Sequence, residues 1–134
     1  MTYLNLKNIR YMIYKKSWKY ILIKASCLDD LYFGYRPKAV KKFSDVYIGR
    51  FGGYVHGYHN LSQSGNCWIY CNAIVSDNAQ VTENACIYEE ARICENAKVY
   101  GNAKVSGHAY VYGYAKVYGN ANIENNTVTC GDVK

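Results

Sequence analysis

The sequence has few of the features that mark a secreted, membrane-spanning or linker-rich protein. Proline occurs once in 134 residues, at Pro37, so the chain has no proline-rich linker. No stretch approaches the roughly 20 apolar residues that a membrane helix needs. The apolar run at 20–23 lies between two lysines and is too short for a signal peptide. We therefore expect a cytoplasmic protein, located in the host cytoplasm if a phage encodes it, with no membrane partner.

Metal-binding and disulfide patterns are also missing, although the chain contains six cysteines. The spacings from Cys67 to Cys71 and from Cys86 to Cys94 do not form the CxxC pairs of zinc sites. Without a secretion signal, reduced cysteines that pack as small apolar residues are the expected state. We predict neither a metal ion nor a cofactor.

Charge and tyrosine are the features that stand out. Residues 1–60, called the head below, hold eleven Lys and Arg against three Asp, a net charge of +8. Residues 61–134 hold five against seven acidic residues, a net charge of −2. Tyrosine occurs 16 times. A basic, tyrosine-rich head suits an anionic partner, because cations attract the charge and rings offer stacking faces. A solvated surface on a capping segment is the alternative interpretation.

From residue 66 onward the chain repeats every six residues. Aliphatic residues occupy every sixth position from Ile69 to Ile123, and a small residue lies two positions before each, from Cys67 to Ala121. A period of six fits neither an α-helix nor one long strand, but it fits short strands that are joined by tight corners and stacked in coils. The Ala-x-Val segments predict strands. Pairs such as Gly101–Asn102 predict turns, because both residues tolerate positive φ. We expect this register to hold through residue 129.

Three six-residue sides close a triangle of 18 residues, so each residue stacks about 4.8 Å from the one 18 positions later. The prediction is an all-β parallel solenoid of roughly three and a half coils over the repeats. The repeats resemble the left-handed β-helix of the hexapeptide-repeat family. Together with the aromatic stretch 54–66, they are similar to tandem A-x-V-x-G-N proteins of phages, prophages and bacteria that are described as acetyltransferase-like. Left-handedness is implied by this resemblance alone.

The predicted organisation has three parts. Residues 1–60 form a basic cap rich in short strands, residues 61–130 form the β-helix, and residues 131–134 form a C-terminal tail. We expect a bulge or tight turn at Gly52–Gly53, and the pattern leaves open a helix within 7–25. A solenoid needs its open ends covered. The five residues that follow Thr129 are a thin cover for the far end.

Stacking by 18 residues sorts the outward side chains onto three faces. The first face carries Trp68, Cys86 and Lys104. The second face is the least polar and predicts self-association, with a trimer favoured by the resemblance. Its interface candidates are Ile74, Arg92, Cys94, Tyr110, Tyr112 and Val128. The third face stacks Lys98 on Lys116 and Tyr100 on Tyr118, a pattern that suits an anion beside a stacked base. Stacked tyrosines are also ordinary strand residues, and that alternative stays open.

Histidine decides the case for an enzyme. The family that the repeats resemble transfers acyl groups with a histidine general base, often near a loop that interrupts the repeats. Here the repeats hold only His108, in a turn position, and no loop interrupts 66–129. We therefore predict no catalytic residue. His56 and His59 are candidates for a ligand site together with His108 of a neighbouring subunit. The acidic column Asp77, Glu83, Glu89 and Glu95 is interpreted as a solvated rim.

We expect a non-enzymatic, homo-oligomeric binding protein that sequesters an anionic, nucleotide-like ligand or blocks a host defence protein. One alternative is a hexapeptide-repeat acyltransferase, and another is an assembly module of a phage particle or filament. Nucleic acid is a lesser alternative, because the basic head lacks a recognised binding motif.

Overall fold

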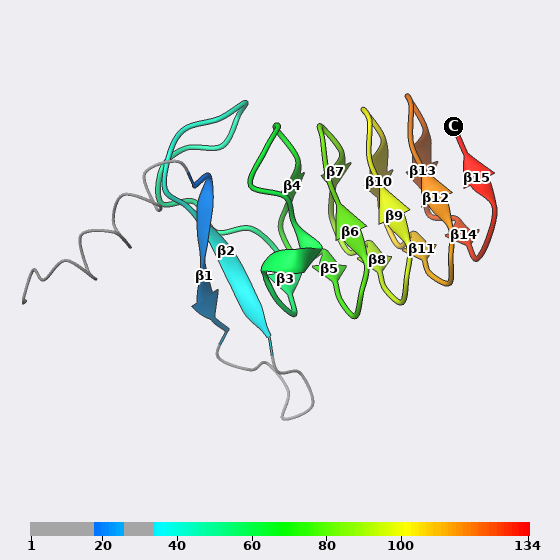
Figure 1. The fold of residues 1–134 in the computed structure, drawn as a ribbon, viewed down its shortest axis with the longest axis horizontal. Coiled ribbons are helices and arrows are strands. Elements are labelled where there is room, and N and C mark those ends of the chain that lie inside the picture. Colours follow the sequence, from blue (N-terminus) through cyan, green and yellow to red (C-terminus); the bar gives the residue numbers. More distant parts are fainter. Residues whose placement is uncertain (1–17, 26–33) are drawn as a thin grey trace, which may run out of the picture.

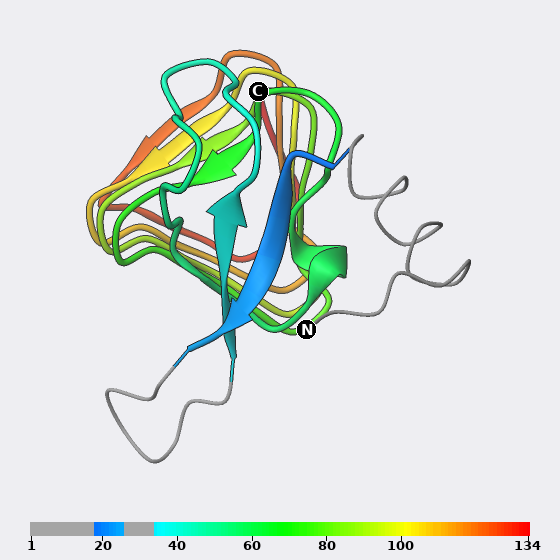
Figure 2. The same cartoon turned by 90° about the vertical axis from the view of Figure 1, so that its left-hand side faces the viewer.

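The computed structural model describes residues 18–25 and 34–134, and these form a three-sided parallel β-solenoid of about four coils with a capping hairpin at one end (Figures 1 and 2). The predicted all-β solenoid is confirmed. The left-handed coil stays a prediction from the family resemblance.

Three parallel sheets make the sides of the solenoid. The first face contains β4 (Trp68–Ile69), β7 (Cys86–Ile87), β10 (Lys104–Ser106) and β13 (Asn122–Glu124). The second face contains β3 (Tyr54–Val55), β5 (Ile74–Val75), β8 (Arg92–Ile93), β11 (Tyr110–Val111) and β14 (Thr127–Val128). The third face contains β6 (Gln80–Val81), β9 (Lys98–Val99), β12 (Lys116–Val117) and β15 (Asp132–Val133).

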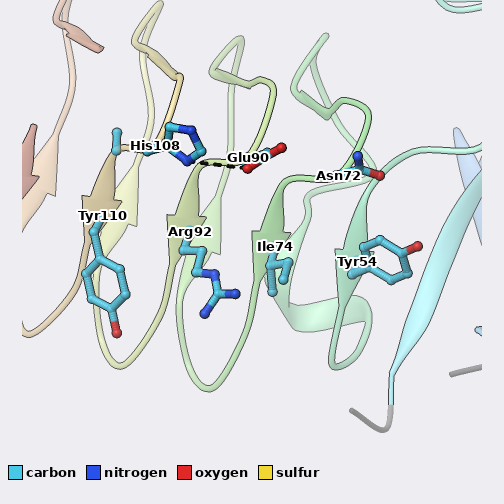
Figure 3. A pocket seen from close by; sticks show the side chains of 8 residues that line it. Tyr54, Asn72, Ile74, Glu90, Arg92, His108 and Tyr110 are labelled. Carbon is cyan, nitrogen blue, oxygen red and sulfur yellow. Dashed lines mark ion pairs between the residues drawn. The ribbon is translucent and has the colours of Figure 1, made fainter. Parts of the chain in front are cut away.

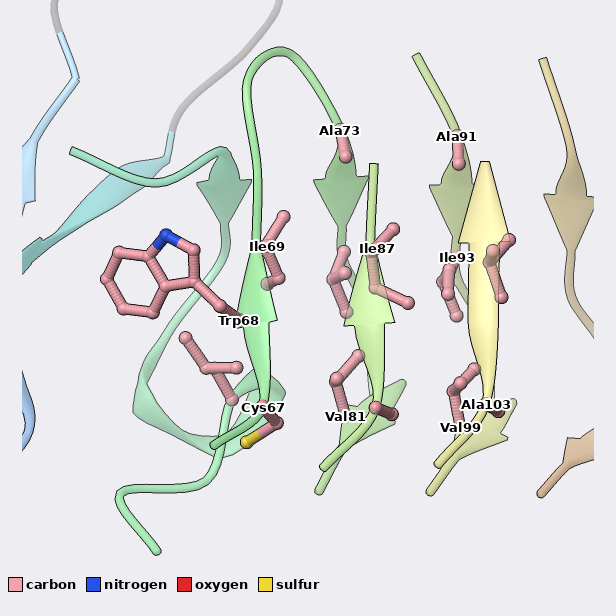
Figure 4. Close-up of a cluster of buried hydrophobic side chains, with 14 of the residues drawn as sticks. Cys67, Trp68, Ile69, Ala73, Val81, Ile87, Ala91, Ile93, Val99 and Ala103 are labelled. Atoms are coloured by element: carbon pink, nitrogen blue, oxygen red, sulfur yellow. The ribbon is translucent and has the colours of Figure 1, made fainter. Parts of the chain in front are cut away.

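The interior of the triangle is filled by the two columns that the repeat predicts. The alanines from Ala73 to Ala115 and the aliphatic residues from Ile69 to Val117 are almost completely buried. Figure 4 shows Ile69, Ile87, Val81 and Val99 pointing into this interior from neighbouring coils. Alanine at the corners lets the backbones approach closely, and branched side chains fill the remaining space at crystal-like density. The repeat therefore encodes a continuous core one residue thick on each side.

The corners are tight because one residue per repeat adopts positive φ. This conformation recurs every sixth residue at Gly65, Cys71, Asp77, Glu83, Glu89, Glu95, Gly101, Gly107, Gly113, Gly119 and Asn125. The predicted turn chemistry at the glycines is confirmed. The acidic residues adopt the same left-handed conformation, which costs a residue with a Cβ atom about 1–2 kcal/mol.

Some of these carboxylates hydrogen-bond to the next coil, a role that the sequence interpretation of a solvated rim did not include. Glu83 Oε2 accepts the Gly101 N–H at 2.8 Å, and Glu95 Oε2 accepts the Gly113 N–H at 2.9 Å. Asp77 likewise accepts the Glu95 N–H at 3.0 Å. These side chains are exposed, as predicted, and they also satisfy backbone donors at the corners.

Hydrogen bonds between coils run in one direction only. Each strand N–H donates to a carbonyl in the following coil, as from Ile74 to Ala91 at 3.0 Å and from Lys98 to Ala115 at 2.9 Å. The first coil therefore presents carbonyl groups without donors at its outer end, and the last coil presents N–H groups. The two ends of the solenoid are chemically different.

The head supplies the donors that the first coil lacks. The N–H groups of Gly53 and Tyr54 donate to the carbonyls of Ile69 and Ala73 at 2.8 and 2.9 Å. The buried Asn60 side chain donates to the Ala79 carbonyl at 2.9 Å from the 3-10 helix η1 (Tyr58–Asn60). The head thus caps the solenoid by hydrogen bonding and not only by covering it.

Lys19 completes this cap from inside the protein. Its buried ammonium donates to the Cys67 carbonyl at 2.7 Å and to the Gly65 carbonyl at 3.3 Å, and it lies 4.9 Å from the centre of the Phe43 ring. Burial lowers the pKa of Lys19. Burial also raises the pKa of the Cys67 thiol, whose sulfur lies 3.3 Å from the Lys19 nitrogen. A lysine is kept here because it brings several donors to carbonyls that no strand reaches.

The capping hairpin consists of β1 (Tyr20–Lys24) and β2 (Tyr35–Ala39), which pair in antiparallel register and extend the second face. The helix left open within 7–25 is wrong for 20–24, and residues 7–17 lie outside the described residues. Trp68 points outward as the stacking predicts, but it is buried under the head, with its ring 5.2 Å from Phe43 and 6.1 Å from Tyr20 (Figure 4). Its indole nitrogen has no hydrogen-bond acceptor among the described residues.

Gly52 and Gly53 serve close packing and do not form the expected bulge or turn. A Cβ atom would lie 2.7 Å from the Ile69 carbonyl oxygen at Gly52 and 2.3 Å from the Ala73 oxygen at Gly53. Only glycine lets the head backbone approach the first coil closely enough to donate its hydrogen bonds.

The expected constant register is wrong in the last coil. Val111 pairs with Val128, 17 positions later, and Val117 pairs with Val133, 16 positions later. Val128 therefore takes the inward position and Thr127 the outward one, so Val128 does not extend the outward strip of the second face. The segment expected to be a tail contains β15, which continues the third face.

Replacing Lys19 tests the proposed cap. We expect Lys19→Met to lower the free energy of unfolding by about 1–3 kcal/mol, because two carbonyl groups lose their donor. Urea denaturation measures the change, and Lys24→Met, at an exposed lysine of the same hairpin, is the matched control. Equal effects of the two substitutions would show that Lys19 does not stabilise the first coil.

Replacing the acidic turn residues separates backbone strain from hydrogen bonding. The Glu89 carboxylate has no hydrogen bond within the described residues, so Glu89→Gly should only relieve the left-handed strain and stabilise the fold by about 0.5–1 kcal/mol. Glu95→Gly relieves the same strain but removes the acceptor of the Gly113 N–H. It should therefore be less stabilising than Glu89→Gly by about 1 kcal/mol in urea denaturation. The reverse order would contradict this assignment.

Candidate functional site

The second face carries an open groove of about 550 Å³ that runs across four strands. Its lining residues are Tyr54, Asn72, Ile74, Glu90, Arg92, His108, Ala109 and Tyr110 (Figure 3). They come from coils far apart in the sequence, and the 18-residue stacking brings them into two parallel rows.

The floor of the groove is a ladder of outward strand residues. Tyr54, Ile74, Arg92 and Tyr110 occupy matching positions on β3, β5, β8 and β11. The Arg92 guanidinium is exposed and has no ion pair in the part of the chain that the structure describes. It lies between Ile74 on one side and the Tyr110 ring on the other (Figure 3). A cation thus lies between an aliphatic and an aromatic neighbour.

Tyr110 is held in place by the next residues of the same coil pair. Its ring packs edge-on against Tyr112 at 4.7 Å, and its hydroxyl lies 3.5 Å from the Cys94 sulfur. This hydrogen bond raises the pKa of Tyr110, and burial raises the pKa of the Cys94 thiol. Both groups are therefore neutral at physiological pH, which leaves the charge on the floor of the groove to Arg92.

The rim of the groove is a column of turn residues. Asn72, Glu90 and His108 each follow a left-handed turn residue at the corner between the first and second faces. His108 Nδ1 lies 3.3 Å from Glu90 Oε2, and these side chains are 78% and 62% exposed. Such an exposed pair is weak. The same three residues border a smaller hollow of about 260 Å³ that continues over the corner.

A second groove of about 500 Å³ lies between the head and the first face. Tyr70 and Tyr88 stack there with ring centres 4.7 Å apart, and Arg50 lies 5.4 Å from the Tyr70 ring. The Tyr70 hydroxyl donates to Asp45 at 2.6 Å. Burial raises the pKa of Tyr70, and it raises the pKa of Tyr88 to about 12. The hydrogen bond ties the head to the solenoid.

The third-face ladder has the predicted arrangement, but its rings are occupied. Lys98 pairs in register with Lys116, and the Tyr100 and Tyr118 rings stack 5.1 Å apart and 7° from parallel. The rings fill each other's facing surfaces, so no base fits between them. Lys116 also lies in register with Asp132, whose negative charge reduces the attraction for an anion.

The three histidines do not meet within one chain. His56 Nδ1 accepts the Asp77 N–H at 3.1 Å, and His59 Nε2 lies 2.7 Å from the Asp77 carbonyl oxygen. Both therefore lie at the corner between the second and third faces, whereas His108 lies at the corner between the first and second. Of the ligand candidates predicted from the sequence, only His108 lines the groove of the second face.

The interface candidates and the groove share one surface. Ile74, Arg92 and Tyr110 line the groove, while Cys94 and Tyr112 lie beside it. The sequence interpretation missed Tyr54, Asn72 and Glu90. Asn72, Glu90 and His108 are each 18 positions apart, so the same stacking applied to the turn residues would have found the rim.

No protein-family model and no curated protein matches the chain. Residues 18–25 and 34–134 contain no group of three or more His, Cys, Asp or Glu side chains that could hold a metal ion. Within the same residues, no helix is long and apolar enough to cross a membrane.

Proposed function

We propose that the protein is a non-enzymatic, homo-oligomeric binding protein whose second face holds an anionic ligand that contains a ring, such as a nucleotide. The observation that carries this proposal is the Arg92 guanidinium, exposed in the groove between Ile74 and Tyr110. A guanidinium without an acidic partner is a strong site for phosphate or carboxylate.

The other groups of the groove complement such a ligand. The Tyr54 and Tyr110 rings offer surfaces for a base. Asn72 and His108 offer hydrogen bonds from the rim, and Glu90 accepts one from an amino group. A volume of about 550 Å³ lies within the usual range for small-molecule sites.

The groove is open, and this supports an oligomer. Small-molecule sites normally bury most of the ligand surface, so a second copy of the chain that packs beside the groove would complete the enclosure. The exposed Tyr110 and the more exposed Tyr114 provide apolar surface for that contact. The resemblance to hexapeptide-repeat proteins favours a trimer. In a phage-encoded protein, the role would be to sequester a host nucleotide signal or to block a host defence protein from the same face.

Acyl transfer is the alternative that a specific observation favours. Glu90 on His108 Nδ1 leaves Nε2 directed outward as a proton acceptor, which is the arrangement of a general base. We rank it second because both side chains are largely exposed and the groove does not enclose them.

Ligand binding is tested first by native mass spectrometry of the protein purified from cells, and then by calorimetric titration with AMP, ATP, pyrophosphate and coenzyme A. We expect a nucleotide to bind and Arg92→Gln to weaken it at least about tenfold, because a charged hydrogen bond is lost. Lys98→Gln, on the third face, is the matched control and should leave binding unchanged.

Three results would overturn this assignment. No bound mass and no heat with any probe would remove the binding function. A loss of affinity in Lys98→Gln instead of Arg92→Gln would move the site to the third-face ladder. Cleavage of acetyl-coenzyme A that disappears in His108→Ala would establish the acyltransferase.

Self-association is tested by light scattering after size-exclusion chromatography. We expect a trimer of the 15.3 kDa chain, and Ile74→Lys should dissociate it by burying a charge in the contact. Gln80→Lys places the same charge in the equivalent outward position of the third face and should leave the oligomer intact. A wild-type monomer at micromolar concentration would refute this interface.

A further inference from the structure

The loop between β2 and β3 presents two large apolar side chains at its apex. Tyr47 and Ile48 are 65% and 70% exposed. They lie in a tight turn that is closed by the hydrogen bond from the Arg50 N–H to the Tyr47 carbonyl at 3.1 Å, with Gly49 at φ +90°. The loop extends from the capped end of the solenoid, away from the groove of the second face (Figure 1).

This apex is supported by buried contacts, so its exposure is a property of the folded loop. Val46, next to Tyr47, is completely buried. Its N–H and carbonyl exchange hydrogen bonds with Phe43 at 2.8 and 3.1 Å, and the Phe43 ring packs against Trp68. Asp45 accepts the Tyr70 hydroxyl. The fold therefore spends three residues on anchoring a loop whose tip touches nothing.

Cations surround the apex on both arms of the loop. Lys41 and Lys42 precede it and Arg50 follows it, all three exposed. Lys38 lies on β2, with its ammonium 5.6 Å from the Phe51 ring. The Lys42 ammonium lies 5.3 Å from the Tyr47 ring. Asp45 is the one acidic residue of this segment, and Tyr70 already hydrogen-bonds to it.

We propose that this loop, Lys41 to Arg50, docks the protein onto an anionic bilayer surface, with Tyr47 and Ile48 inserted at the headgroup level and the surrounding cations on the lipid phosphates. Tyrosine and aliphatic side chains partition into the interfacial region, and clustered Lys and Arg recognise anionic headgroups. This is peripheral binding and requires no membrane-spanning segment.

Two other classes of partner fit the loop less well. Protein interfaces are depleted in lysine, and three of the four cations here are lysines. Single-stranded nucleic acid needs free ring faces for stacking. Ile48 has no ring, and a lysine already lies over Tyr47. A fluid lipid surface accepts a small convex apex without a shaped pocket.

The test is co-sedimentation of the full-length protein with vesicles of phosphatidylcholine, with and without about 30% phosphatidylserine (a composition chosen to mimic an anionic leaflet). We expect binding to the anionic vesicles only, weakened by raised salt. Lys41→Glu with Lys42→Glu should weaken it at least about tenfold, since each cation near the surface contributes about fivefold. Tyr47→Ser with Ile48→Ser should also weaken it about tenfold or more, because the inserted apolar surface is lost.

Matched controls separate the loop from general charge and exposure. Lys98→Glu with Lys134→Glu makes the same charge change on the solenoid, and Tyr114→Ser removes a tyrosine that is 77% exposed elsewhere. Both should retain most of the binding. Unchanged thermal melting of the loop variants shows that they fold.

Four results would overturn the proposal. The first is no binding to anionic vesicles, which would leave an acidic protein as the partner class to pursue. The second is equal binding to neutral vesicles. The third is equal losses in the loop and control variants. The fourth is preferential binding of a single-stranded oligonucleotide that competes with the vesicles.

Discussion

The hydrogen bond between successive coils is the interaction on which the rest of the structure depends. Because every strand donates forward, the solenoid has a carbonyl end and an N–H end. An unpaired backbone group shielded from water costs about as much as a lost hydrogen bond. The carbonyl end must therefore be satisfied by something other than another coil, and the head meets this need with Gly53, Tyr54, Asn60 and Lys19.

The N–H end is treated differently. The last coil is shorter, with pairings 17 and 16 residues apart instead of 18, and polar residues such as Asn122, Glu124 and Asp132 line it. Exposed edge strands of this kind are commonly protected by charge and by short length. Since the head covers the complementary carbonyl end, head-to-tail stacking of copies is blocked at one side. This weakens the interpretation of the protein as a filament module.

The same stacking rule creates the surfaces on which function is proposed. Residues 18 positions apart meet, so a groove needs only a few irregular substitutions in one column. Arg92 interrupts an otherwise apolar floor, and His108 interrupts a rim of Asn and Glu. The head adds surfaces outside the periodic pattern. Its loop carries the cations and the exposed apex, while its buried side supplies the cap.

The repeat by itself determined most of the solenoid. The strands, the buried columns, the turns and the pairing of Lys98 with Lys116 follow from a period of six, because covalent geometry fixes how short strands turn and stack. A period does not determine where it fails. The shortened last coil displaced Val128 to the interior, since the Val111 partner is set by space and not by counting.

The head and the site were decided only by the tertiary structure. Lys19 looks like any surface lysine in the sequence, and only the unpaired carbonyls of Gly65 and Cys67 explain its burial. Gly52–Gly53 suggested a turn, whereas the nearby Ile69 and Ala73 carbonyls require glycine for close approach. His56, His59 and His108 share a residue type, but the triangular cross-section separates them onto two corners. Local sequence sets the conformation of each repeat, and long-range contacts decide which residues of the head meet the first coil.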